Sequence, residues 1–209
     1  ADRPAGAVAG ASSVLIKAGW NSYTSTTTMY GGDLVFGATS DIQSDGGLDA
    51  YASAGSVTAT GGHITQAGSM NAEGNVFIDG DRDVTINGNV TANGRIELWA
   101  GWNETPYYGG SLEFGTSSNV AAYGGDLLAY AIGASESAGD IRQLGGSLYS
   151  SQYLTLAADG NVDLNGRAEA TVNLHLYAGI DNYNSADDPG LTSAYGGNVL
   201  LRGGSELIG

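Results

Sequence analysis

DVTINGNVTANGRIELWAG, at residues 83–101, contains the pattern that decides the fold. Apolar residues alternate with polar ones in VTI at 84–86 and again in IEL at 96–98. An alternation with a period of two places the apolar pair of each triplet on one face of a strand and the middle residue on the other. Asn-Gly pairs at 87–88 and 93–94 are typical of tight turns. The stretch therefore predicts short strands, each with one buried face, joined by turns.

The same alternation recurs along the chain and predicts which side chains form the core. We expect the apolar members of these triplets to be buried: Leu34, Phe36, Val84, Ile86, Ile96, Leu98, Leu112, Phe114, Leu154, Leu156, Val162, Leu164, Leu174 and Leu176. We expect the middle residues to face outward: Glu97, Glu113, Thr155, Asp163 and His175.

A long internal repeat organises the chain. Residues 31–101 align with residues 109–179 at an offset of 78 without a gap, so that RIELWAG in the first block matches NLHLYAG in the second. We expect a single β-solenoid at 14–209, with partial copies of the repeat at 14–19 and 196–209. Residues 1–13 are expected to form a flexible or partner-binding N-terminal arm.

The copies differ in length at one point only. Each copy has an Ala-Gly pair (the AG element, at 18–19, 100–101 and 178–179) followed by a Gly-Gly pair (the GG element, at 31–32, 109–110 and 196–197). The segments between the two pairs are residues 20–30, 102–108 and 180–195. Variable length at one fixed point of a repeat is typical of surface loops. We therefore expect aromatic loops of variable length on one side of the molecule.

The spacing of the strand-like triplets indicates the architecture. Three such strands take about 20 residues, which suits one coil of a parallel β-helix in which each strand pairs with its equivalent one coil away. The 35 glycines supply the turns between the faces. The sequence thus predicts an all-β fold, namely a parallel β-helix (β-solenoid). At about 20 residues per coil, the chain would make roughly ten coils. A propeller would need four strands per blade in a closed ring, which fits the repeat poorly.

Composition excludes several classes of function. The chain has 22 acidic residues against seven Lys and Arg, a net charge of −15, which disfavours nucleic acid as a partner. The absence of cysteine excludes disulfides and thiolate chemistry, and no apolar run approaches the length of a membrane span. No nucleophile motif of the Ser-His-Asp, GxSxG or P-loop kind occurs. We expect no catalytic residues and no enzymatic activity.

One acidic segment is a candidate metal site. Asp79, Asp81 and Asp83 have the D-x-D-x-D spacing that opens a calcium-binding EF-hand loop. The sixth and twelfth positions of that loop would be Val84 and Val90 instead of glycine and glutamate. Solvated turn carboxylates are therefore the first interpretation, with calcium as the alternative, and no other cofactor is expected.

The variable loops contain the candidate binding residues. Aromatic side chains occur beside amides and carboxylates in these loops, where they could cover a flank of the solenoid, contact another copy, or stack on a glycan. The residues concerned are Trp20, Tyr23, Trp102, Tyr107, Tyr108 and Tyr183.

GNVTANGRIELWAG at 88–101 and ADGNVDLNGRAE at 158–169 resemble the haemagglutinin-type repeats of filamentous-haemagglutinin-like exoproteins. The resemblance implies a secreted protein at the cell surface or outside the cell, in the form of a fibre or an adhesin. We expect a structural protein that assembles end to end into a homo-oligomer or filament. The alternatives are a display stalk that binds glycans through its aromatic loops and, third, a polysaccharide-degrading β-helix enzyme.

Overall fold

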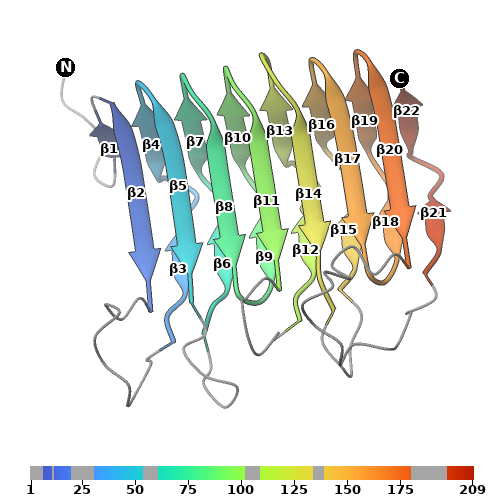
Figure 1. Cartoon of the computed structure of the whole chain (residues 1–209), viewed down its shortest axis with the longest axis horizontal. Coiled ribbons are helices and arrows are strands. Elements are labelled where there is room, and N and C mark those ends of the chain that lie inside the picture. The colour runs from blue at the N-terminus through green and yellow to red at the C-terminus, as the bar shows by residue number, and fades with distance from the viewer. Residues whose placement is uncertain are drawn as a thin grey trace, which may run out of the picture.

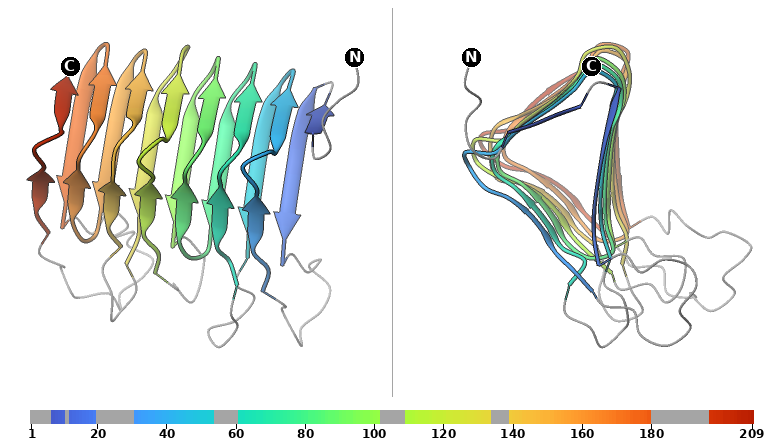
Figure 2. Two further views of the ribbon diagram at one scale, coloured as in Figure 1. Left: turned by 180° about the vertical axis from the view of Figure 1, so that it is seen from behind. Right: turned by 90° about the vertical axis from the view of Figure 1, so that its left-hand side faces the viewer.

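A computed structural model describes residues 7–10, 12–19, 31–53, 61–101, 109–133, 139–179 and 197–209. Every regular element in these residues is a β-strand, and the strands form three parallel sheets along one axis (Figure 1). Viewed along that axis, the strands outline a triangle with one sheet on each side (Figure 2). The predicted all-β parallel β-helix is confirmed.

The chain visits the three sheets in turn, so that three consecutive strands make one coil. Sheet A contains β1 (Ala7–Gly10), β4 (Asp41–Ser44), β7 (Ser69–Ala72), β10 (Asn89–Ala92), β13 (Asn119–Ala122), β16 (Ser147–Ser150), β19 (Arg167–Ala170) and β22 (Glu206–Ile208). Sheet B contains β2 (Ser13–Ala18), β5 (Gly47–Ala52), β8 (Val76–Gly80), β11 (Ile96–Ala100), β14 (Leu127–Ala131), β17 (Tyr153–Ala158) and β20 (Asn173–Ala178). Sheet C contains β3 (Leu34–Phe36), β6 (Ile64–Gln66), β9 (Val84–Ile86), β12 (Leu112–Phe114), β15 (Ile141–Gln143), β18 (Val162–Leu164) and β21 (Val199–Leu201).

The number of coils differs from the expected ten. The described strands make seven coils, and β22 adds an eighth strand to sheet A alone. A coil takes 20 residues where its corners are tight, as between Asn75 and Arg95. It takes 37 residues where a long segment joins sheet B to sheet C, as between the register partners Asp163 and Leu200. The variable segments therefore take up residues that further coils would need.

The 78-residue repeat corresponds to three coils. In sheet A, Asp41 pairs in register with Ser69, Ser69 with Asn89, and Asn89 with Asn119, which is 78 residues after Asp41. The same three steps lead from Leu48 to Leu127 in sheet B, an offset of 79. They lead from Ile64 to Ile141 in sheet C, an offset of 77. Relative to the preceding three coils, one extra residue lies before β14, two are missing between β14 and β15, and one extra before β16 restores the offset of 78 at Ser147. An ungapped alignment conceals these shifts.

Apolar residues of all three sheets fill the interior in the predicted register. Of the fourteen side chains expected in the core, ten have an exposed fraction of 0%. The other four, Leu34, Phe36, Leu174 and Leu176, are half-buried against the core because they lie in the outermost coils. The middle residues face outward as expected, since Glu97, Glu113, Thr155, Asp163 and His175 are all partly exposed.

The AG elements end at a corner that requires glycine. Gly19, Gly101 and Gly179 have φ angles of 70°, 83° and 69°, a region that residues with a Cβ rarely adopt. A Cβ on Gly101 would also lie 2.4 Å from the backbone nitrogen of Gly110 and from the carbonyl oxygen of Ile132. The corner from sheet B to sheet C is therefore too tight for a side chain.

All three variable loops connect sheet B to sheet C at this corner. Residues 20–30 lie between β2 and β3, residues 102–108 between β11 and β12, and residues 180–195 between β20 and β21. The loops themselves lie outside the described residues. Part of the expected N-terminal arm belongs to the solenoid, because β1 pairs with β4 and places Ala7 opposite Asp41.

Candidate functional site

The aromatic loop residues predicted as a binding site lie outside the part of the chain that the structure describes. These are Trp20, Tyr23, Trp102, Tyr107, Tyr108 and Tyr183. Their role as a glycan or partner site stays a prediction.

The three candidate metal ligands have different surroundings. Asp79 is half-buried on the outer side of β8. Asp83 lies directly before β9, at the start of sheet C. Its Oδ1 accepts a 2.8 Å hydrogen bond from the backbone N–H of Ser111, and its Oδ2 lies 3.4 Å from Nδ1 of His63. Within the described ranges, no three His, Cys, Asp or Glu side chains come close enough together to hold a metal ion. Calcium binding therefore stays a prediction.

Aspartate and asparagine side chains at the position of Asp83 stabilise the stacking of the coils. Oδ1 of Asp33 accepts a 3.0 Å hydrogen bond from the backbone N–H of His63. Oδ1 of Asp140 accepts a 2.8 Å hydrogen bond from the backbone N–H of Asn161. Such bonds satisfy backbone donors at the start of sheet C. Asp83 is thus one member of a structural ladder that joins each coil to the next.

Asp79 lies in a more unusual environment. Burial, together with the nearby carboxylates of Asp81 and Glu97, raises the pKa of Asp79 to about 7 from 3.8. Its Oδ1 is buried and has no hydrogen-bond partner among the described residues. The register places Asp79 beside Tyr51 on one side and Trp99 on the other. This carboxyl group is therefore poised to change charge near neutral pH, in the middle of an aromatic surface.

That surface is the outer face of sheet B, which has the densest aromatic contacts in the described structure. The rings of Trp99 and Tyr130, on β11 and β14, stack with centroids 4.2 Å apart. Tyr51 and Phe77, on β5 and β8, lie 5.5 Å apart in a tilted arrangement. Farther along the axis, His175 packs between the exposed rings of Tyr153 and Tyr177, at 6.3 and 5.9 Å. Aromatic pairs at these distances stabilise a sheet and offer a large contact surface.

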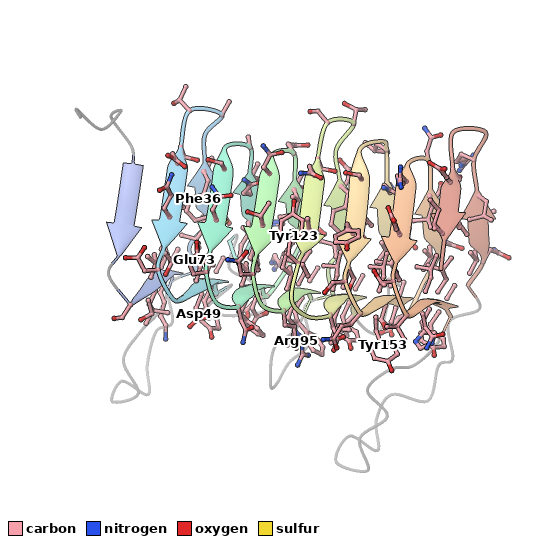
Figure 3. The ribbon with its side chains drawn as sticks, turned by 90° about the horizontal axis from the view of Figure 1, so that it is seen from above. Phe36, Asp49, Glu73, Arg95, Tyr123 and Tyr153 are labelled. Carbon is pink, nitrogen blue, oxygen red and sulfur yellow. The ribbon has the colours of Figure 1, made fainter. Side chains whose placement is uncertain are left out.

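Charged groups occur among these rings. Nη2 of Arg95 lies 2.6 Å from Oε2 of Glu97, and Nε1 of Trp99 donates a 2.7 Å hydrogen bond to the other oxygen of that carboxylate. A shallow cavity opens beside this group and is lined by Asp49, Tyr51, Asn75, Val76, Phe77, Arg95 and Glu97. Asp49, Arg95 and Tyr153 lie along one outer side of the rod (Figure 3).

These outward-facing aromatic residues were not among the sequence-based predictions, although the period-two alternation indicates them. In IELWA at 96–100, the triplet gives Glu97 as an outward residue, and one further step along the same strand gives Trp99. The same step in LLAYA at 127–131 gives Tyr130. Extending the triplets to full strands would have predicted the aromatic row.

The two end coils form a second candidate surface. In the last coil, inward positions are open: Leu201 is 55% exposed, whereas Leu164, its register partner one coil earlier, has an exposed fraction of 0%. The turn after β21 is fixed to the preceding coil by Arg202, whose Nε donates to Oδ1 of Asp163 at 2.7 Å. This pairing lowers the pKa of the Asp163 carboxyl group. The outermost described coil is therefore fixed to the preceding coil, while its inward-pointing apolar residues are exposed at the end of the rod.

The described residues define a three-faced parallel β-solenoid with an aromatic, acidic outer face and with exposed apolar side chains in its outermost described coil. No protein-family model, curated protein or solved structure matches this chain. In the described residues no helix is long and apolar enough to cross a membrane.

Proposed function

We propose that this protein is a secreted structural β-solenoid that associates end to end with further copies of itself into a filament or matrix. The main support is the exposure of apolar side chains in the outermost described coil. Val199, Leu201 and Leu207 are 43%, 55% and 38% exposed, but their register partners one coil earlier are fully buried. Covering this apolar surface with another coil would contribute about 25 cal/mol per Å².

The strand edges at both ends support the same mode of contact. β20, β21 and β22 are edge strands at one end of the sheets, and β1, β2 and β3 are edge strands at the other. Edge strands present unpaired N–H and C=O groups that can pair with another chain. A second copy in the same orientation would continue the parallel sheets, and such a head-to-tail contact repeats without closing.

The strand count determines how two copies would meet. Sheet A has eight strands and sheets B and C have seven. If β2 and β3 of the next copy extend sheets B and C directly, the place of its β1 in sheet A is already taken by β22. The joint therefore requires β1 of the incoming copy to leave its place beside β4. In the resulting contact, Tyr177 of one copy would lie beside Lys17 of the next, as Lys17 now lies 5.1 Å from the ring of Tyr51.

The extracellular location is supported by the resemblance to haemagglutinin-type repeats at 88–101 and 158–169. Such exoproteins form long β-helical rods, and an end-to-end array of this chain would have the same form.

Substitution in the open coil tests the assembly. We expect Leu201→Asp to abolish concentration-dependent association in sedimentation velocity, because a buried unpaired charge at the joint is costly. Leu144→Asp is the matched control, because Leu144 is 44% exposed on a mid-rod turn and should leave association unchanged. Equal loss of association in both variants, or association unaffected by Leu201→Asp, would contradict the end contact.

A display stalk that binds glycans is the second candidate. The aromatic outer face of sheet B favours this function, since paired aromatic rings lie partly exposed beside carboxylates along the rod. Glycan binding by this face and assembly through the ends would use different surfaces, so each can be tested separately.

A further inference from the structure

The shallow cavity on sheet B has three kinds of chemistry within one small surface. It spans β5, β8 and β11, about 10 Å along the rod at the usual strand spacing. The rings of Tyr51 and Phe77 supply its apolar part. The carboxylates of Asp49 and Glu97 supply hydrogen-bond acceptors, and the guanidinium of Arg95 supplies donors.

The polar groups of the cavity are held in place by neighbours. Glu97 is fixed between Arg95 at 2.6 Å and the indole N–H of Trp99 at 2.7 Å. The side-chain Oδ1 of Asn75 accepts the backbone N–H of Arg95 at 2.9 Å, which fixes the start of β11 against β8. Because these groups are already oriented, a ligand would lose little affinity in ordering them.

The exposure of these groups leaves room for a ligand. The side chain of Arg95 is 43% exposed and that of Glu97 is 20% exposed, so both keep polar atoms at the surface. Burial and the charges of Asp49 and Asp79 raise the pKa of the Tyr51 phenol, which therefore stays a neutral hydroxyl at physiological pH. Tyr51 offers a ring and a hydroxyl donor in the same place.

We propose that this cavity binds a neutral saccharide segment lying along the rod axis. The C–H face of a sugar ring is apolar and would pack on Tyr51 and Phe77, while its hydroxyls can donate to Asp49 and Glu97 and accept from Arg95. A hydroxyl both donates and accepts, so one ligand class satisfies the carboxylates and the guanidinium. An acidic polysaccharide fits poorly, because two carboxylates line the cavity and the chain has a net charge of −15.

The experiment measures binding of uncharged glucans, namely dextran, laminarin and cello-oligosaccharides, by affinity gel electrophoresis and calorimetry. Heparin and polygalacturonate serve as anionic probes. We expect at least one uncharged glucan to bind the unmodified chain. Phe77→Ala should weaken that binding about three- to tenfold, the range for one aromatic contact.

Two further variants keep the test decisive. Asp49→Asn preserves the size of the side chain and should weaken glucan binding without changing the circular dichroism spectrum. Tyr123→Ala is the control: Tyr123 is 55% exposed at a corner outside the cavity, and its loss should leave binding unchanged. Leu201→Asp should also bind normally, which separates this site from the end contact. The proposal is overturned if no uncharged glucan binds, if the anionic probes bind better, if Tyr123→Ala weakens binding equally, or if Phe77→Ala changes only self-association.

Discussion

Asp79 and Trp99 occupy paired positions on β8 and β11, so that a carboxyl group with a pKa near 7 lies beside an indole ring on the outer face of sheet B. The pKa of Asp79 is raised first by burial and then by Asp81 and Glu97. This arrangement links the stability of the fold to pH.

Replacing Asp79 by asparagine is expected to stabilise the protein above neutral pH. Between about pH 4 and pH 7 the folded chain holds a proton on Asp79 that the unfolded chain has released, because the folded pKa is about 7 and the ordinary value is 3.8. The stabilising effect of the neutral Asp79 carboxyl group on the free energy of unfolding is therefore fully present below pH 4 and is lost as the pH rises to 7. At about 1.4 kcal/mol per pKa unit, the loss is on the order of 2–4 kcal/mol.

Thermal unfolding between pH 4 and pH 8 in the presence of a chelator would measure this effect. Asp79→Asn should flatten the dependence of Tm on pH, while Asp45→Asn, at an exposed turn, should keep the slope of the unmodified protein. An unchanged slope in Asp79→Asn would mean that the carboxyl group is not protonated in the folded state.

Truncating an inward side chain should cost far more stability than truncating an outward one. Leu98 is fully buried on β11, and Leu98→Ala should reduce the free energy of unfolding by about 2–5 kcal/mol. Chemical denaturation measures the change. Thr155→Ala, at an outward position of β17, should cost much less, and a comparable cost for both would contradict the assigned register.

Gly101 should resist substitution more than most glycines. Gly101→Ala is expected to destabilise by more than about 1 kcal/mol, because φ is 83° and a Cβ would lie 2.4 Å from two backbone atoms. Gly37→Ala is the matched control, since no atom lies within 4 Å of its Cβ position. Equal unfolding midpoints for the two variants would show that the corner is less tight than described.

Period-two alternation is sufficient to predict which side chains of a coil point inward, because a strand with one buried face has the same pattern in every sheet. It places Leu98 and Phe114 inside and Glu97 outside, as the structure has them. The number of coils is not predictable in this way, since nothing in a triplet distinguishes a sheet strand from a segment of a variable corner. The shift of one residue before Leu127 is followed by an opposite shift of two residues before Ile141, and the offset of 78 returns at Ser147, so the ungapped repeat conceals both shifts.

The candidate site was only partly predictable for a different reason. The sequence shows that Asp79, Asp81 and Asp83 are close in the chain, but the corner after β8 puts Asp79 on one face and Asp83 at the start of the next. Conversely, Asp49, Phe77 and Glu97 are 20 or more residues apart and meet only because coils stack in register. Such a surface depends on coil length, which the sequence pattern alone leaves undetermined.

Electron microscopy of the negatively stained chain at increasing concentration, with and without calcium, is the decisive test of end-to-end assembly. One molecule should be about 35 Å long, from eight strands of sheet A at the usual spacing. End-to-end assembly predicts rods of constant width whose lengths are multiples of that value. The rods should be more numerous at high salt or with calcium, because screening reduces repulsion between chains of charge −15. Single particles of about 35 Å under every condition, with a monomer mass by light scattering, would contradict it.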